Sequence, residues 1–142
     1  MTVEIALASH EADIAACWPV MRQLRPDITE QAFVPFVRRL AEQQGFELAH
    51  LKSGRMVLAV AGLRQGEWLA GGRYLEIEDL VTAEEARGRG WGGQLFDWIA
   101  VLAKERGCRH LRLVSRTSRE AAHRFYRSKG MTDEALYFSL DL

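Results

Sequence analysis

Apolar and polar residues alternate along several short stretches of the chain, whereas other stretches repeat apolar positions every three or four residues. A period of two predicts strands, and the longer repeat predicts amphipathic helices. The expected strands are residues 3–7, 46–51, 56–63, 74–81, 110–116 and 136–140. The expected helices are residues 10–24, 27–44, 94–106 and 118–129.

Turn and capping residues mark the ends of these elements. Asp27 with Glu30, and Thr117 with Glu120, fit the capping-box pattern of a helix start. A glycine follows three of the helical stretches, where a C-terminal cap is expected. The middle strands follow one another with only short turns between them, which favours hairpins over a doubly wound sheet. No repeat, low-complexity tract or linker divides the chain, so we expect one mixed α/β domain over residues 1–142.

The composition is that of an ordinary globular domain, with 142 residues, 48% hydrophobic and 27% charged. Cys17 and Cys108 form neither a disulfide framework nor a metal-binding pair. The longest uncharged apolar run, Met56–Leu63, is far too short to cross a bilayer, and the first residues lack a signal-peptide pattern. These features predict a cytoplasmic protein with no structural metal and no membrane partner.

Charge is distributed unevenly, although the net charge is zero. Residues 1–86 contain 8 basic and 13 acidic side chains, and residues 87–142 contain 11 and 6. This asymmetry suggests an anionic ligand in the second half and a cationic one in the first, although solvated surface charge explains it as well. The basic segment Lys104–Lys129 has no aromatic stacking pattern, so we expect no nucleic-acid partner.

The glycine-rich stretch 87–93 precedes a predicted helix and carries two arginines. Free amides at a helix N-terminus bind phosphate, and glycines let the backbone approach it closely, so a diphosphate is the expected ligand. The stretch lacks the G-K-[ST] of a Walker A loop. The spacing Gly88-x-Gly90-x-x-Gly93 matches the dinucleotide-binding fingerprint, but position 113, where an acid is needed, is a leucine. We therefore interpret that match as accidental.

A third pattern fits better. Arg87-x-x-Gly90-x-Gly92 follows the [QR]-x-x-G-x-[GA] signature, and residues 121–131 read AAHRFYRSKGM. Together they make the chain resemble the GNAT superfamily of N-acetyltransferases over nearly its whole length. The resemblance implies a mixed α/β (α+β) fold with a mostly antiparallel, twisted central sheet of about six to seven strands and about four flanking helices. It also implies acetyl-CoA as co-substrate and direct acetyl transfer to a primary amine of a small molecule or protein.

The resemblance implies a cofactor site as well. The pantetheine arm would lie along the backbone of Leu80 and Val81, like an added strand. Arg119 stands seven residues before Tyr126, where many members have an asparagine, and would pair with a CoA phosphate instead. The pyrophosphate would contact the loop residues Arg87, Gly88, Arg89, Gly90, Trp91 and Gly92.

Catalysis requires a proton donor for the departing thiolate and a base for the amine. The family motif implies that Tyr126 is the donor. Glu76 and Glu78 share one face of a predicted strand, so either of them, or a water chain, would serve as base. By the same alternation Asp79 is expected to point the other way, with Ile77 and Val81.

Two functions remain open at this point. The leading hypothesis is an acetyl-CoA-dependent N-acetyltransferase, and the alternative is a catalytically idle acyl-CoA-binding sensor or regulatory module of the same fold. The acidic first half suggests a cationic acceptor, such as a polyamine, an aminoglycoside-like amine, a lysine or a peptide N-terminus. Paired subunits are frequent in the family, which makes a homodimer an expectation.

Overall fold

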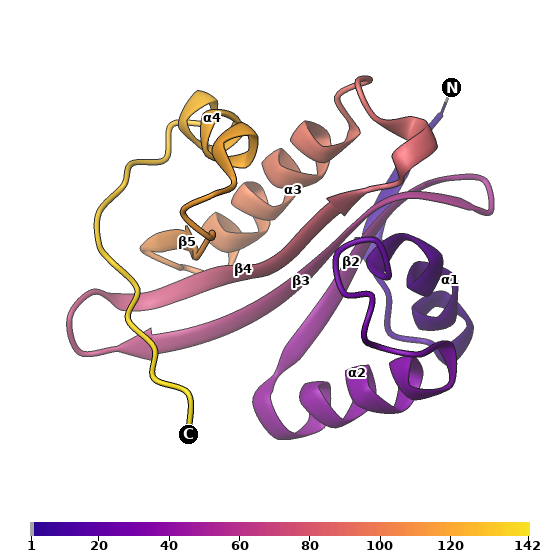
Figure 1. Cartoon of the computed structure of the whole chain (residues 1–142), viewed down its shortest axis with the longest axis horizontal. Coiled ribbons are helices and arrows are strands. Elements are labelled where there is room, and N and C mark those ends of the chain that lie inside the picture. Colours follow the sequence, from indigo (N-terminus) through magenta and orange to yellow (C-terminus); the bar gives the residue numbers. More distant parts are fainter. Residues whose placement is uncertain (1) are drawn as a thin grey trace. The chain divides into compact units, whose positions relative to one another are not determined.

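One five-stranded sheet, in the order β1-β2-β3-β4-β5, organises the computed structural model, which describes residues 2–142 (Figure 1). Strand β1 pairs antiparallel with β2, β2 with β3, and β3 with β4. The strands are β1 Glu4–Leu7, β2 Phe46–Ser53, β3 Met56–Trp68, β4 Gly72–Thr82 and β5 His110–Leu113. The helices are α1 Glu11–Met21, α2 Glu30–Gln44, α3 Trp91–Glu105 and α4 Glu120–Ser128, with a short 3-10 turn at Glu84–Ala86.

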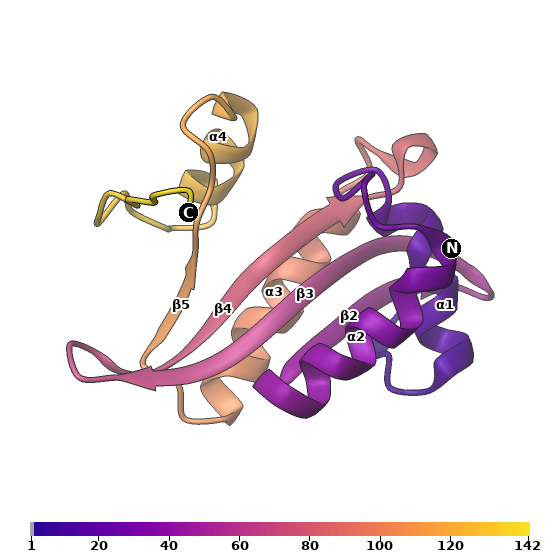
Figure 2. The ribbon, with the colours of Figure 1, turned by 60° about the horizontal axis from the view of Figure 1, so that its bottom comes forward.

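The chain divides into two compact units, Met1–Arg112 and Leu113–Leu142. In the first unit, α1 and α2 cover one face of the sheet and α3 covers the other (Figures 1 and 2). Burial alternates along part of β4, whereas most of β2 and the first half of β3 are buried on both faces, because helices pack on each side of these strands. The largest fully buried side chains are Leu48, Leu51, Leu63, Leu75, Leu95 and Ile99.

The mixed α/β fold and the hairpins are confirmed, while several element ends differ from the prediction. Helix α2 begins after Thr29, whose side chain accepts a hydrogen bond from the Ala32 amide, so the capping box at Asp27 is wrong. The box at Thr117 is wrong too, because Arg119 occupies the N-cap of α4. Gly45 ends α2 at φ 69°, as predicted.

The predicted strand at residues 136–140 is wrong. Residues 131–142 have no regular secondary structure, and Leu136, Phe138 and Leu140 are all exposed. The sheet therefore has five strands among the described residues, fewer than expected. Alternation describes a residue pattern, but a strand also needs a neighbour to bond. This segment has none within its own unit.

Within residues 2–142, no helix combines the length and hydrophobicity that a membrane span requires. Both cysteines are free thiols. No group of three or more histidine, cysteine, aspartate or glutamate side chains in this part of the chain has the arrangement of a metal site.

Candidate functional site

The glycine-rich loop forms the N-terminus of α3. Gly88 and Gly90 have φ angles of 81° and 83°, in the left-handed region that side chains disfavour. The first backbone bond of the helix runs from the Gln94 amide to the Gly90 carbonyl, 3.0 Å away. The amides of residues 91–93 therefore have no helical acceptor. They lie at the positive end of the helix dipole, an arrangement that suits an anion.

Two further features of this loop suit an anionic ligand. Arg87 and Arg89 are exposed, and neither forms an ion pair with another residue in 2–142. The indole Nε1 of Trp91 is buried and has no hydrogen-bond partner in the part of the chain that the structure describes. A buried donor without an acceptor is costly, so its presence beside the loop favours a ligand acceptor there.

The second half of β4 has an open edge. Strand β5 lies beside the first half, where the Arg109 amide donates to the Arg73 carbonyl at 2.8 Å. Leu80 and Val81 pair with β3 on one side, and no strand of residues 2–112 lies on their other side. An extended ligand can therefore bond to this edge of β4 as an additional strand would.

A β-bulge lies in the middle of β4. Gly62 of β3 is opposite Asp79, but the next residue, Leu63, is opposite Ile77, so Glu78 has no partner. The extra residue reverses the alternation, and as a result the side chains of Glu78 and Asp79 line the same cavity. The expectation that Asp79 points with Ile77 is wrong for this reason.

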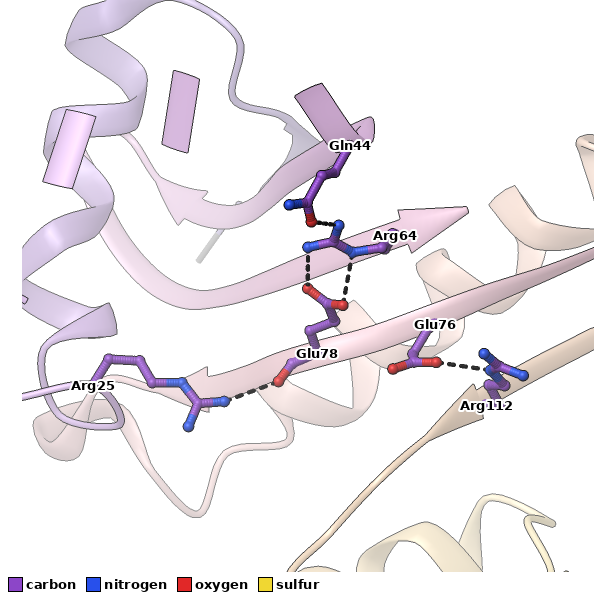
Figure 3. Close-up of polar contacts among 6 residues, drawn as sticks. All are labelled: Arg25, Gln44, Arg64, Glu76, Glu78 and Arg112. Carbon is purple, nitrogen blue, oxygen red and sulfur yellow. Dashed lines mark hydrogen bonds and ion pairs between the residues drawn. The ribbon is translucent and has the colours of Figure 1, made fainter. Parts of the chain in front are cut away.

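Glu76 and Glu78 stand on one side of β4, as predicted, but each is paired with its own arginine (Figure 3). Arg64 donates to both carboxylate oxygens of Glu78, at 2.8 and 3.1 Å, and also contacts Gln44 Oε1. Arg112 donates to Glu76 at 2.7 Å. The two glutamates are thus ion-paired rather than left as free bases.

Asp79 is the most buried of the three carboxylates, with 12% of its side chain exposed. Arg25, from the turn after α1, donates through Nε to Asp79 Oδ1 at 2.7 Å and through Nη2 to the Glu78 carbonyl at 3.0 Å. Burial raises the pKa of Asp79, and Arg25 only partly offsets this. The raised pKa makes this carboxylate a stronger base than an exposed aspartate.

The cavity beside Asp79 has a volume of about 230 Å³. It lies on the face of the sheet that α1 and α2 cover, and Glu78, Asp79 and Arg25 are the charged residues among those of 2–142 that line it. Its apolar walls consist of Met21, Ile28, Phe33, Phe36, Val37, Leu40, Phe46 and Leu48.

The second unit carries the remaining predicted residues on α4. The Tyr126 ring meets Phe125 edge-on at 5.6 Å. His123 Nε2 lies 2.9 Å from the Arg116 carbonyl and 3.2 Å from Ser115 Oγ, contacts that suit a structural histidine at the start of the helix. Arg119 caps the helix through its backbone and forms no ion pair with the described residues.

Comparison with known proteins identifies the family. The model of the Acetyltransferase (GNAT) family matches residues 9–131, most of the chain. The chain belongs to this family. It is 29% identical, over 87% of its length and 88% of the relative's, to the uncharacterised N-acetyltransferase YhdJ of Bacillus subtilis strain 168.

Solved structures share the fold. A transcriptional regulator from Bacillus halodurans C-125 superimposes with a TM-score of 0.85 and 23% identity, covering 99% of this chain and all of that one. The aminoglycoside N-acetyltransferase AAC(6')-Iy in complex with CoA gives a TM-score of 0.84 and 13% identity, covering 99% and 95% of the two chains. These likenesses show that the chain has the GNAT fold.

Sequence reasoning missed Asp79, Arg25 and Gly62 as parts of the site. One signal was present: Glu78-Asp79 puts two acids in succession within an alternating strand, and such a break in alternation indicates a bulge. No sequence pattern around Arg25 indicates that it belongs to the site, since its contact with Asp79 depends on how the turn after α1 reaches β4.

Proposed function

We propose that this protein is an N-acetyltransferase that transfers the acetyl group of acetyl-CoA directly to a primary amine of a small molecule or peptide. The observation that carries the proposal is the N-terminus of α3, where the free amides of residues 91–93 lie next to the unpaired Arg87 and Arg89. This arrangement suits the pyrophosphate of CoA.

The other cofactor contacts follow from the same loop and from β4. The amides of residues 87–92 wrap the pyrophosphate, and the Trp91 indole N–H supplies a donor that lacks an acceptor in the protein. Leu80 and Val81 bond the pantetheine arm along the open edge of β4. Arg119 contributes charge for a CoA phosphate. The acetyl group then reaches the C-terminal part of β4.

The reaction forms a C–N bond and breaks the C–S bond of the thioester. A neutral amine nitrogen attacks the carbonyl carbon, while an amide near Val81 donates to the carbonyl oxygen. The amine gives up a proton to Glu76, Glu78, Asp79 or a water chain to one of them. Tyr126 donates the proton that the sulfur takes as it leaves.

Calorimetric titration with acetyl-CoA, CoA and NADH tests the cofactor assignment. Wild type should bind acetyl-CoA and CoA but not NADH, and Gly90→Glu should bind neither, because it strains a left-handed backbone and adds a negative charge at the anion site. Gly45→Glu is the matched control, since it makes the same change at a left-handed glycine in open space, at the C-cap of α2. Absence of acetyl-CoA binding to wild type would refute the proposal.

The idle acyl-CoA-binding module is the second candidate, and the ion pairing of Glu76 and Glu78 favours it. Thiol release from acetyl-CoA in the presence of amines separates the two. An enzyme releases CoA only when an amine is added, and Tyr126→Phe slows this release while leaving acetyl-CoA binding intact. Binding without any amine-dependent release would favour the idle module.

A further inference from the structure

The cavity beside Asp79 has the side chains needed to bind an amine, but it can neutralise little positive charge. Two carboxylates face it, but both oxygens of Glu78 accept from Arg64. Asp79 Oδ1 accepts from Arg25, and its Oδ2 accepts no hydrogen bond from the described residues. One carboxylate oxygen is therefore free, next to a guanidinium that repels further cations.

The walls of the cavity determine the polarity and size of the ligand that it can bind. All lining residues other than the three charged ones are apolar, and Phe33, Phe36 and Phe46 are aromatic. An apolar cavity of about 150 Å³ is large enough to admit benzene. At about 230 Å³, this one has room for a single ring and a short alkyl link.

We propose that this cavity binds the acceptor, and that the acceptor is a primary monoamine with a compact apolar body of about one ring, its nitrogen at Asp79 Oδ2 and its body against the phenylalanines of α2 and β2. The inference rests on the acetyltransferase function proposed above and specifies its substrate. It narrows the cationic acceptor expected from the acidic first half to a molecule with one ammonium group. A polyamine or an aminoglycoside would bring additional ammonium groups to apolar walls and to Arg25, where they find no partner.

Asp79 is suited to two roles in this site. Its free oxygen accepts a hydrogen bond from the bound ammonium, and its burial favours transfer of a proton from that group. Gly62 leaves space for the Asp79 carboxylate, because a Cβ on residue 62 would collide with Asp79 Oδ2 and the Phe46 ring. The bulge, the glycine and the buried acid thus form one arrangement on two adjacent strands.

The test compares kcat/KM for 2-phenylethylamine, spermidine and neamine at saturating acetyl-CoA, measured by thiol release with the whole chain. Burial of one ring predicts that 2-phenylethylamine is preferred by about tenfold to a hundredfold. Phe36→Ala should reduce this preference by raising KM for 2-phenylethylamine. Val34→Ala is the control, since it truncates a half-buried residue of the same helix that does not line the cavity. Asp79→Asn should lower kcat/KM for every amine without changing acetyl-CoA affinity.

The outcomes separate this inference from the proposed function. If acetyl-CoA binds and spermidine or neamine is the better acceptor, the monoamine inference is overturned and the acetyltransferase function stands. If acetyl-CoA does not bind, the function itself fails. If no amine turns over, titration of 2-phenylethylamine into the CoA-bound protein decides: binding that Phe36→Ala weakens supports the cavity assignment, and no binding overturns it.

Discussion

Gly62 is the residue on which the geometry of the acceptor cavity depends most, and Gly62→Ala tests that dependence. The new Cβ would lie 2.7 Å from Phe46 Cζ and in contact with Asp79 Oδ2, far inside van der Waals distance. The Phe46 ring is buried at 6% exposure and cannot move freely, so Asp79 must turn away. Such overpacking costs about 1–3 kcal/mol of unfolding free energy. Because Asp79 moves, acceptor kcat/KM should also fall, whereas acetyl-CoA affinity should not change.

Urea denaturation measures the stability change, and thiol release with 2-phenylethylamine measures the change in kcat/KM. Gly66→Ala is the matched control on the same strand, because its Cβ would collide with the Tyr74 ring, away from the cavity. It should lose stability but keep acceptor activity. In the Asp79→Ala background Gly62→Ala should cost less, with a coupling of about 0.5–3 kcal/mol. Unchanged stability and unchanged activity in Gly62→Ala would refute this account of the bulge.

Three further predictions concern buried titratable groups. The pKa of Asp79 is raised in the fold, so its ionised form destabilises the fold as pH rises above 3.8. In urea denaturation, Asp79→Asn should therefore be more stable than wild type at pH 7 but not near pH 3.5. An equal effect at both pH values would contradict this. Burial lowers the pKa of His50 from 6.5, so wild-type stability should fall as pH drops below 6.5, and His50→Leu should flatten that slope; a slope unaffected by the substitution would exclude His50 as its source. Burial raises the pKa of the Cys17 thiol to about 12, so a thiol reagent should modify only the half-exposed Cys108 in native protein and both cysteines in urea; rapid modification of Cys17 would show that α1 opens readily.

The sequence predicted those features that depend on local chemistry. Alternating residues located five of the six expected strands but not the one at 136–140, which has no strand beside it within its own unit. The glycine after Gln44 located the end of α2, because a left-handed C-cap requires little beyond the glycine itself. The glycine-rich loop was predictable for the same reason. Asp79 was not, since its direction depends on a bulge, and the bulge depends on Gly62 in another strand.

The charge asymmetry of the sequence does not show which acidic and basic side chains form ion pairs in the fold. Within residues 2–142, two acids of the first half pair with arginines of the second: Glu47 with Arg106 and Glu76 with Arg112. Part of the acidic excess is thus neutralised within the fold and is not available to a ligand. A sum over residues 1–86 therefore suggests a cationic acceptor without limiting its number of charges, whereas the cavity favours a single ammonium group.

The most direct test is mass spectrometry of the reaction products. The protein is incubated with 2-phenylethylamine and with acetyl-CoA whose acetyl group is isotopically labelled. We expect labelled N-acetyl-2-phenylethylamine and an equal amount of free CoA, both strongly reduced in Gly90→Glu and in Asp79→Asn. No labelled amide from this amine or from spermidine and neamine, although acetyl-CoA binds, would contradict the assignment as an acetyltransferase of amines.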